Sequence, residues 1–332
     1  MVDRFRFQNV AIVGIGLIGS SIALALRAGG FKGPIAIGDR NGDALRVASE
    51  IGLGTSYHVS AAKAVAGADM VILAVPVGSM QATGRAIAPS LQADAIVTDV
   101  GSVKGSVIEA MAGSLPQSAR FVAGHPIAGS EQSGPRAGFA TLFAKRWCII
   151  TPTPETDQDA LDVVADMWRG FGSHIEMMDA ERHDLVLSIT SHLPHLIAYN
   201  LVRTASDMES VAESEVIKFS AGGFRDFTRL AASDPTMWRD VFLNNRVAVL
   251  ESLGRFSEDL AILQRAIRWG DGDTLYEIFE RTRTVRTDVV GAGQDTAAPD
   301  FGRPREESSG EETASEEAAE DDAEAAPVSA AR

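Results

Sequence analysis

The stretch Val10-Ala11-Ile12-Val13, followed at once by Gly14-Ile15-Gly16-Leu17-Ile18-Gly19, predicts the fold of the first half of the chain. Four consecutive apolar residues are typical of a strand buried on both faces of a parallel sheet. A helix-like run over 20–28 begins directly after the last glycine, so the G-x-G-x-x-G pattern lies between a strand and a helix. Glycines at such a junction let the backbone approach a pyrophosphate at the helix N-terminus. We therefore expect a dinucleotide to bind the six residues from Gly14 to Gly19.

A second strand, predicted over 35–38, ends in Asp39, which is 20 residues after Gly19. An acidic side chain at this place accepts hydrogen bonds from the adenosine ribose hydroxyls. Its charge would repel the 2′-phosphate of NADP, so Asp39 favours NAD as the cofactor. The neighbouring Arg40 keeps NADP open as the alternative.

Helical and strand-like segments then alternate as far as residue 178. The expected helices cover 42–51, 61–66, 80–88 and 159–168, and the expected strands cover 70–74, 95–99, 139–151 and 174–178. This alternation predicts an α/β Rossmann-type fold with a doubly wound parallel sheet. Val75-Pro76 and Gly101 follow two of the strands, and we expect them to face the cofactor.

Ser102 and Lys104 follow the strand over 95–99, and each has two readings. Ser102 is either the N-cap of a helix or a polar contact to the substrate or nicotinamide. Lys104 is either a surface residue or a positive charge near an anionic ligand. Spacing alone does not separate these alternatives.

The Gly/Pro/Ser-rich stretch from Gly124 to Gly134 contains a titratable imidazole, His125. This composition predicts a loop, and the strand-like residues 120–123 precede it. His125 should then lie just past the carboxyl end of a strand, where ligands bind in open α/β sheets. We take His125 as the candidate catalytic residue, the alternative being a histidine that caps a turn.

From residue 179 to about 290 the apolar periodicity is helical, and no strand alternation stands out. Helices are expected over 180–203, 210–219, 235–270 and 274–287. Several carry more apolar surface than one face of a small domain needs, which favours a homodimer formed through this all-α part.

Two polar clusters lie in the helical part. His192 and His195 are three residues apart, so both can face one side of a helical turn; a metal pair, core histidines and a substrate pocket are the alternatives. No Cys or carboxylate with ligand spacing accompanies them, and we expect no metal. In the second cluster Gly222-Gly223 precede Arg225 and Arg229, which share a face if the segment is helical. A guanidinium there can clamp a carboxylate, or the face can simply be solvated.

Charge and composition limit the class of protein. The net charge is −15, of which the residues from 291 onward carry −9, so the remainder is only mildly acidic. Neither nucleic acid nor a membrane is expected as a partner, and the cytoplasm is the expected location. The single cysteine, Cys148, lies in an apolar run, which predicts a buried thiol. We expect a nucleotide-binding domain over 1–178, an all-α domain over 179–290 and a disordered acidic tail over 291–332.

Taken together, five motifs in order resemble the prephenate/arogenate (cyclohexadienyl) dehydrogenase family of tyrosine biosynthesis. They are the glycine pattern 14–19, Asp99-Val100-Gly101-Ser102-Val103-Lys104, the stretch 124–134, Ser191-His192-Leu193-Pro194-His195 and Gly222-Gly223-Phe224-Arg225-Asp226-Phe227-Thr228-Arg229. The resemblance covers about residues 10–286. Ala221 stands where relatives often carry a third glycine.

The resemblance implies an oxidative decarboxylation that uses NAD or NADP and converts prephenate to 4-hydroxyphenylpyruvate or arogenate to tyrosine. It further implies a role for each matching residue. His125 accepts a hydrogen bond or proton from the ring C4 hydroxyl, and Arg229 binds a substrate carboxylate. Ser102, His195 and His192 supply further polar contacts, and Gly222 and Gly223 approach the partner subunit's site. Glu131 and Asp226 belong to an ionic network that gates the pocket. The competing functions are another two-domain Rossmann oxidoreductase, such as a β-hydroxyacid dehydrogenase, and a regulator that binds NAD without turnover.

Overall fold

The computed structural model describes residues 5–130, 132–212 and 221–291. Glu131, most of the helix expected over 210–219 and nearly all of the expected acidic tail lie outside the described residues.

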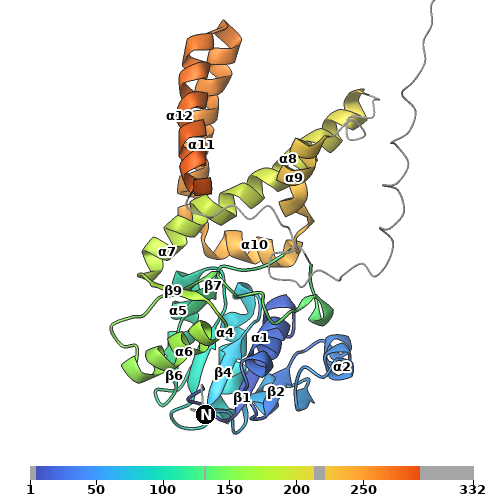
Figure 1. Cartoon of the computed structure of the whole chain (residues 1–332), viewed down its shortest axis with the longest axis vertical. Helices are drawn as coiled ribbons and strands as arrows, with labels where there is room; N and C mark the ends of the chain where they lie inside the picture. The colour runs from blue at the N-terminus through green and yellow to red at the C-terminus, as the bar shows by residue number, and fades with distance from the viewer. Residues whose placement is uncertain (1–4, 131, 213–220, 292–332) are drawn as a thin grey trace, which may run out of the picture.

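A parallel sheet of six strands forms the base of the molecule in the order β3-β2-β1-β4-β5-β6 (Figure 1). The strands are β1 (Val10–Val13), β2 (Ile35–Gly38), β3 (Ser56–His58), β4 (Met70–Leu73), β5 (Ile96–Asp99) and β6 (Arg120–Val122). The connecting helical segments are α1 (Leu17–Ala28), α2 (Gly42–Glu50), α3 (Ala61–Val65), η1 (Val77–Ser79), α4 (Met80–Ile87), η2 (Ala88–Ser90) and α5 (Lys104–Ala112). The predicted Rossmann-type sheet is confirmed.

Each face of the sheet has its own hydrophobic core, because side chains alternate along a strand. Val10 and Ile12 of β1 pack with α1 and α6 (Gln158–Gly170) on one face. Ala11 and Val13 pack with α3, α4 and α5 on the other. Trp238 joins this second core from α10 (Pro235–Asn244), so the helical half is packed onto the sheet.

A second sheet of three strands differs from the expected single sheet. It contains β7 (Gly124–Pro126), β8 (Trp147–Ile150) and β9 (His174–Met177), with β7 antiparallel to β8. The loop expected around His125 is therefore wrong at this residue, since His125 pairs with Ile149. The strand expected over 139–151 is confined to β8, because turns take up residues 140–145; the short helix η3 (Pro135–Ala137) lies before them.

The second half of the described chain is helical, as predicted. Its segments are α7 (Ala180–Leu187), the π-helical turn η4 (Ser188–His192), α8 (Leu193–Ala212), α9 (Gly222–Thr228), η6 (Arg229–Ala232), α10, α11 (Arg246–Trp269) and α12 (Gly272–Gly291). The single helix expected over 235–270 is wrong: it breaks at Asn245, whose backbone leaves the helical region and whose buried side chain bonds to other segments.

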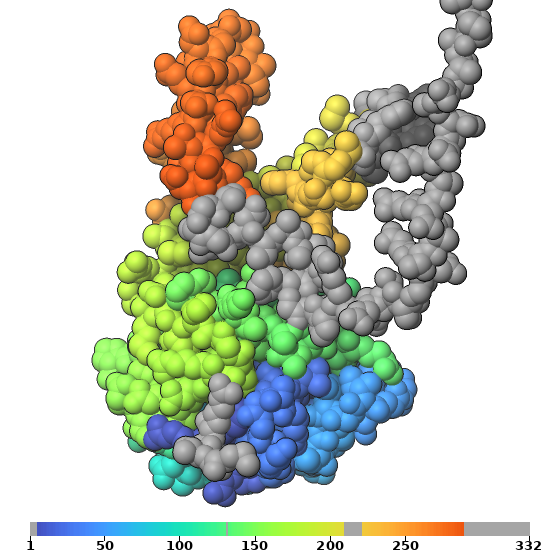
Figure 2. Space-filling view, viewed as in Figure 1, coloured from blue at the N-terminus to red at the C-terminus, as the bar shows by residue number. Residues whose placement is uncertain are grey.

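The helices α11 and α12 form a hairpin that projects away from the sheet (Figure 1), and Figure 2 shows it standing clear of the lower part of the molecule. The exposed apolar side chains on it include Val247, Leu250, Ile267, Trp269, Tyr276 and Phe279. The helical run Ala180–Met208 contains an apolar window of 18 residues of which 28% are buried, and by length and composition alone the run could cross a membrane. The helical half thus exposes much apolar surface.

Candidate active site

His125 is buried at the carboxyl edge of the main sheet, and a buried ion pair fixes the residue before it. Lys104 Nζ lies 2.5 Å from Asp99 Oδ2 and donates to the carbonyl oxygen of Gly124 at 2.6 Å. Asp99 Oδ1 accepts the N–H of Gly124 at 3.2 Å. Both the N–H and the carbonyl oxygen of Gly124 are therefore held by this ion pair, and they fix the backbone directly before His125.

This ion pair excludes the surface reading of Lys104. Its side chain is fully buried, so it is not a surface residue. Its charge is paired with that of Asp99, which opens the same motif and to which the sequence had assigned no role. Lys104 thus acts on His125 from inside the protein.

Ser102 is not the N-cap of α5. Val103 occupies the N-cap position, and the capping acceptor comes from a distant helix: Asp184 Oδ1 accepts from Lys104 N at 2.7 Å and Asp184 Oδ2 from Gly105 N at 2.9 Å. Ser102 itself is half-buried after β5, which leaves its hydroxyl available for the polar contact that the sequence offered as the alternative.

His183 is the hydrogen-bond partner of the His125 side chain, and the sequence had not singled it out. His125 Nδ1 lies 2.9 Å from His183 Nε2, and His183 Nδ1 lies 2.8 Å from Asp184 Oδ1. The three side chains form a continuous hydrogen-bonded row from β7 into α7. Burial, followed by His183, Lys104 and His192, lowers the pKa of His125 well below 6.5, so its imidazole is neutral at pH 7.

The π turn η4 brings His192 into this group. In a regular α-helix, residues nine apart such as His183 and His192 lie on opposite faces. In the wider π turn each residue advances by a smaller angle about the helix axis, so His192 is rotated back toward the side of His183. Such turns are frequent at functional sites. His192 is buried, and burial lowers its pKa to about 4. Its Nδ1 lies 3.1 Å from Asn245 Nδ2, and its Nε2 has no partner among the described residues.

His195 stacks on Trp238 with ring centroids 3.6 Å apart and an interplanar angle of 22°. Its Nδ1 donates to the carbonyl oxygen of Ser191 at 2.8 Å. Burial lowers the pKa of His195, the Ser191 contact raises it, and the charge of Arg229 lowers it further. Arg229 is therefore near His195, although the two lie on different helical segments.

The segment that carries Arg225 and Arg229 is helical: Arg225 lies in α9 and Arg229 begins η6. This is the condition under which the sequence placed the two arginines on one face. Gly222 and Gly223 open α9, and Asp226 pairs with the adjacent Arg225 at 3.2 Å. Glu131, the expected second acid of the ionic network, lies outside the described residues.

The cofactor-binding candidates Gly14 to Gly19, Asp39, Arg40, Val75, Pro76 and Gly101 follow the carboxyl ends of β1, β2, β4 and β5. Gly14 has φ +97°, and a Cβ on it would overlap the carbonyl oxygen of Ala74. A Cβ on Gly19 would overlap the carbonyl oxygen of Gly14, whereas one on Gly16 would meet nothing within 4 Å. A side chain therefore has no room at Gly14 or Gly19, whereas the space beside Gly16 is free of protein atoms.

Asp39 is tied to this turn. Its Oδ2 accepts from Ile15 N at 2.9 Å and its Oδ1 from Asn41 N at 2.8 Å. Each oxygen keeps a second lone pair. The carboxylate is half-buried, so it remains able to accept hydrogen bonds from a bound ribose.

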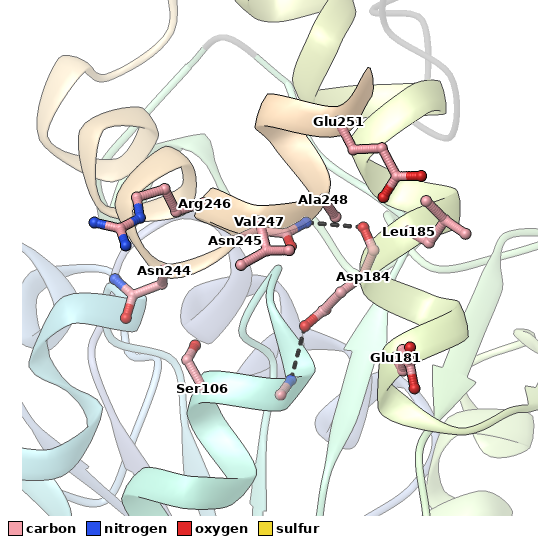
Figure 3. A pocket seen from close by; sticks show the side chains of 11 residues that line it. Ser106, Glu181, Asp184, Leu185, Asn244, Asn245, Arg246, Val247, Ala248 and Glu251 are labelled. Atoms are coloured by element: carbon pink, nitrogen blue, oxygen red, sulfur yellow. Dashed lines mark hydrogen bonds between the residues drawn. The ribbon is translucent and has the colours of Figure 1, made fainter. Parts of the chain in front are cut away.

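A separate pocket of about 340 Å³ lies between the start of α5, α7 and the turn from α10 to α11. Figure 3 shows Asp184 at its wall, bonded to α5 on one side and to Asn245 on the other. His125 does not line this pocket. Over residues 5–130, 132–212 and 221–291, no group of three or more His, Cys, Asp and Glu is arranged to hold a metal ion.

Comparison with known proteins gives consistent matches to both halves. The profile described as "Prephenate dehydrogenase, nucleotide-binding domain" matches residues 22–177, and the one described as "Prephenate dehydrogenase, dimerization domain" matches 179–281. The cyclohexadienyl dehydrogenase of Zymomonas mobilis is 42% identical over 280 residues, covering 84% of this chain and 95% of that protein. The prephenate dehydrogenase of Bacillus subtilis is 34% identical over 296 residues, covering 89% and 79%.

Among solved structures, prephenate dehydrogenase from Aquifex aeolicus in complex with hydroxyphenyl propionate and NAD+ has a TM-score of 0.80 at 37% identity. The match covers 85% of this chain and 98% of that one.

Proposed function

Because the chain belongs to the prephenate dehydrogenase family, we propose that it catalyses the NAD-dependent oxidative decarboxylation of prephenate, arogenate or both. The observation that carries this proposal is the buried, neutral imidazole of His125 at the edge of the nucleotide-binding sheet. A neutral imidazole can accept a proton, and this reaction requires a proton acceptor at the ring hydroxyl.

The chain's residues fit NAD as the cofactor. The turn at Gly16 is open, the first turn of α1 has no side-chain cap, and Asp39 keeps free lone pairs beside it. Unsatisfied N–H groups at a helix N-terminus favour a pyrophosphate. Val75, Pro76 and Gly101 would line the nicotinamide end, and Arg40 would lie near the ribose. The family relative from A. aeolicus holds NAD+.

In the proposed reaction His125 accepts the proton of the C4 hydroxyl through Nε2. NAD, when bound, supplies the acceptor for the hydride that leaves C4. The ring carboxylate then departs as CO2, and its bonding electrons complete the aromatic ring. Arg229 holds a substrate carboxylate, and Ser102, His192 and His195 provide polar contacts around the substrate.

The finer parts of the site are also proposals. Glu131 and Asp226 act as acidic partners in an ionic network that gates the pocket, and Gly222 and Gly223 approach the site of a partner subunit. A homodimer would bury the apolar side chains that α11 and α12 expose, which supports association through the helical half. A cytoplasmic location is part of the same proposal. We propose the domain boundary near residue 178.

The test is absorbance at 340 nm with purified protein and NAD, adding prephenate to one cuvette and arogenate to another, and repeating both with NADP. A rise with either acid supports the proposal, and the ratio of the four rates gives the substrate and cofactor preferences. No rise in any cuvette, with protein that binds NAD, would overturn it in favour of another oxidoreductase or a non-catalytic regulator.

A further inference from the structure

The carboxylate of Asp184 is ionised and acts only as a hydrogen-bond acceptor. It faces three donors: the N–H groups of Lys104 and Gly105 and the Nδ1 of His183. Burial raises the pKa of Asp184, but the bonds from His183, Lys104 and Gly105 outweigh it and leave the pKa below 3.8. An ionised carboxylate has no proton to donate, so His183 must carry its proton on Nδ1.

The tautomer of His183 then fixes that of His125. Burial lowers the pKa of His183, and although Asp184 partly offsets this, the imidazole is neutral at pH 7. A neutral imidazole with its proton on Nδ1 has a lone pair on Nε2. That lone pair faces His125 Nδ1 at 2.9 Å, so His125 donates from Nδ1 and keeps Nε2 unprotonated.

The reverse arrangement is disfavoured by charge. If His125 carried its proton on its own Nε2, its Nδ1 would be a lone pair, and His183 would have to carry its proton on Nε2 to bond to it. The Nδ1 of His183 would then turn a lone pair toward Asp184 Oδ1, 2.8 Å away. Two lone pairs would then face each other without a proton. The other ionisable groups around His125 are Lys104, which is paired with Asp99, the neutral His192, and the buried thiol of Cys148.

We propose that His183 and Asp184 are positioning residues that hold His125 in the tautomer whose Nε2 accepts the substrate proton. This inference deepens the proposed function and rests on it. The same carboxylate caps the start of α5, and Figure 3 shows it at the wall of the pocket between α5, α7 and α11. One side chain of the helical half therefore fixes both the start of a Rossmann helix and the state of the base.

The direct test is the tautomer itself, observed by 15N NMR of histidine-labelled protein with His125→Asn to assign the signal. The expected result is a protonated Nδ1 and an unprotonated Nε2 on His125. In Asp184→Asn the side-chain amide can donate to His183 Nδ1, which would reverse both tautomers. A His125 that carries its proton on Nε2 in the unsubstituted protein would overturn the proposal, whether or not prephenate or arogenate is turned over.

Kinetics give the second test. Asp184→Asn should lower kcat by about 10²–10⁴, as expected when a base is held in the wrong tautomer, with the Kd for NAD unchanged. Since this variant could unfold by loss of the α5 cap, a second pair is needed. His183→Gln keeps an amide oxygen able to accept from His125 Nδ1, whereas His183→Leu does not. The glutamine variant should retain at least tenfold more kcat than the leucine variant, roughly the worth of one hydrogen bond. Equal losses in the two would mean that His183 only fills space.

Discussion

Lys104 Nζ and Asp99 Oδ2 lie 2.5 Å apart with both side chains fully buried, and together they hold the peptide that precedes His125. A buried ion pair is weak evidence for stability in itself, because desolvation opposes the attraction. Removing only one of the two partners strongly destabilises the protein, because it leaves an uncompensated charge in the interior.

Lys104→Met should therefore lower the free energy of unfolding by about 3–5 kcal/mol, measured by urea unfolding at a fixed protomer concentration. The matched control is Arg46→Ala, which breaks an exposed pair with Glu50 at 2.7 Å and should cost under about 1 kcal/mol. Adding Asp99→Asn to Lys104→Met should recover part of the loss. If Lys104→Met and Arg46→Ala lowered the free energy of unfolding by similar amounts, the buried pair of Lys104 and Asp99 would not stabilise the backbone before His125 as described.

His125→Asn should keep NAD binding, because His125 lies outside the glycine turn, and lower the chemical step by roughly 10²–10⁴. Single-turnover absorbance at 340 nm measures the step, and NAD titration measures the Kd. Near-normal turnover would remove His125 from the mechanism.

The pH profile follows from the lowered pKa of His125. The neutral imidazole is the active form, and it is protonated as the pH falls through its pKa. Because burial, His183, Lys104 and His192 lower this pKa well below 6.5, kcat/KM should stay level as the pH falls through 6.5 and decline only at lower pH. An acid limb centred at or above 6.5 would contradict this, provided that the protein remains folded across the range.

Arg229→Ala should raise KM by roughly 10–100-fold with little change in kcat, the pattern for a lost charge-assisted bond that forms before the chemistry. It should also raise the pKa of His195, which the charge of Arg229 lowers. Arg225→Ala is the control, since Arg225 pairs with Asp226. If Arg225→Ala raises KM instead, the carboxylate is held by Arg225.

Two glycine substitutions separate cofactor binding from folding. Gly16→Ala should leave the melting temperature nearly unchanged and raise the Kd for NAD, because its Cβ meets no protein atom but would face the pyrophosphate. Gly19→Ala should lower the melting temperature, because its Cβ would overlap the carbonyl oxygen of Gly14. Unchanged NAD affinity in Gly16→Ala would move the pyrophosphate away from this turn.

The sequence by itself determined the sheet, the glycine turn and the helical second half. These features depend on neighbours in the chain: the apolar run of β1, the glycines after it and the helical periodicity beyond residue 180. The sequence also selected His125 as the candidate catalytic residue, through its place just after a strand and through a motif shared with the family.

Only the tertiary structure decided what surrounds His125. His183 is 58 residues away from His125 along the chain, and Asp184 is 80 residues away from the α5 terminus that it caps. No local pattern marks such contacts, and regular helical spacing would separate His183 from His192 had the π turn not intervened. For Lys104 the sequence left a surface position and a charge near an anionic ligand as equal alternatives, and only the structure places it in a buried pair with Asp99. The burial of a charge depends on the packing of the whole fold, which spacing along the chain does not reveal.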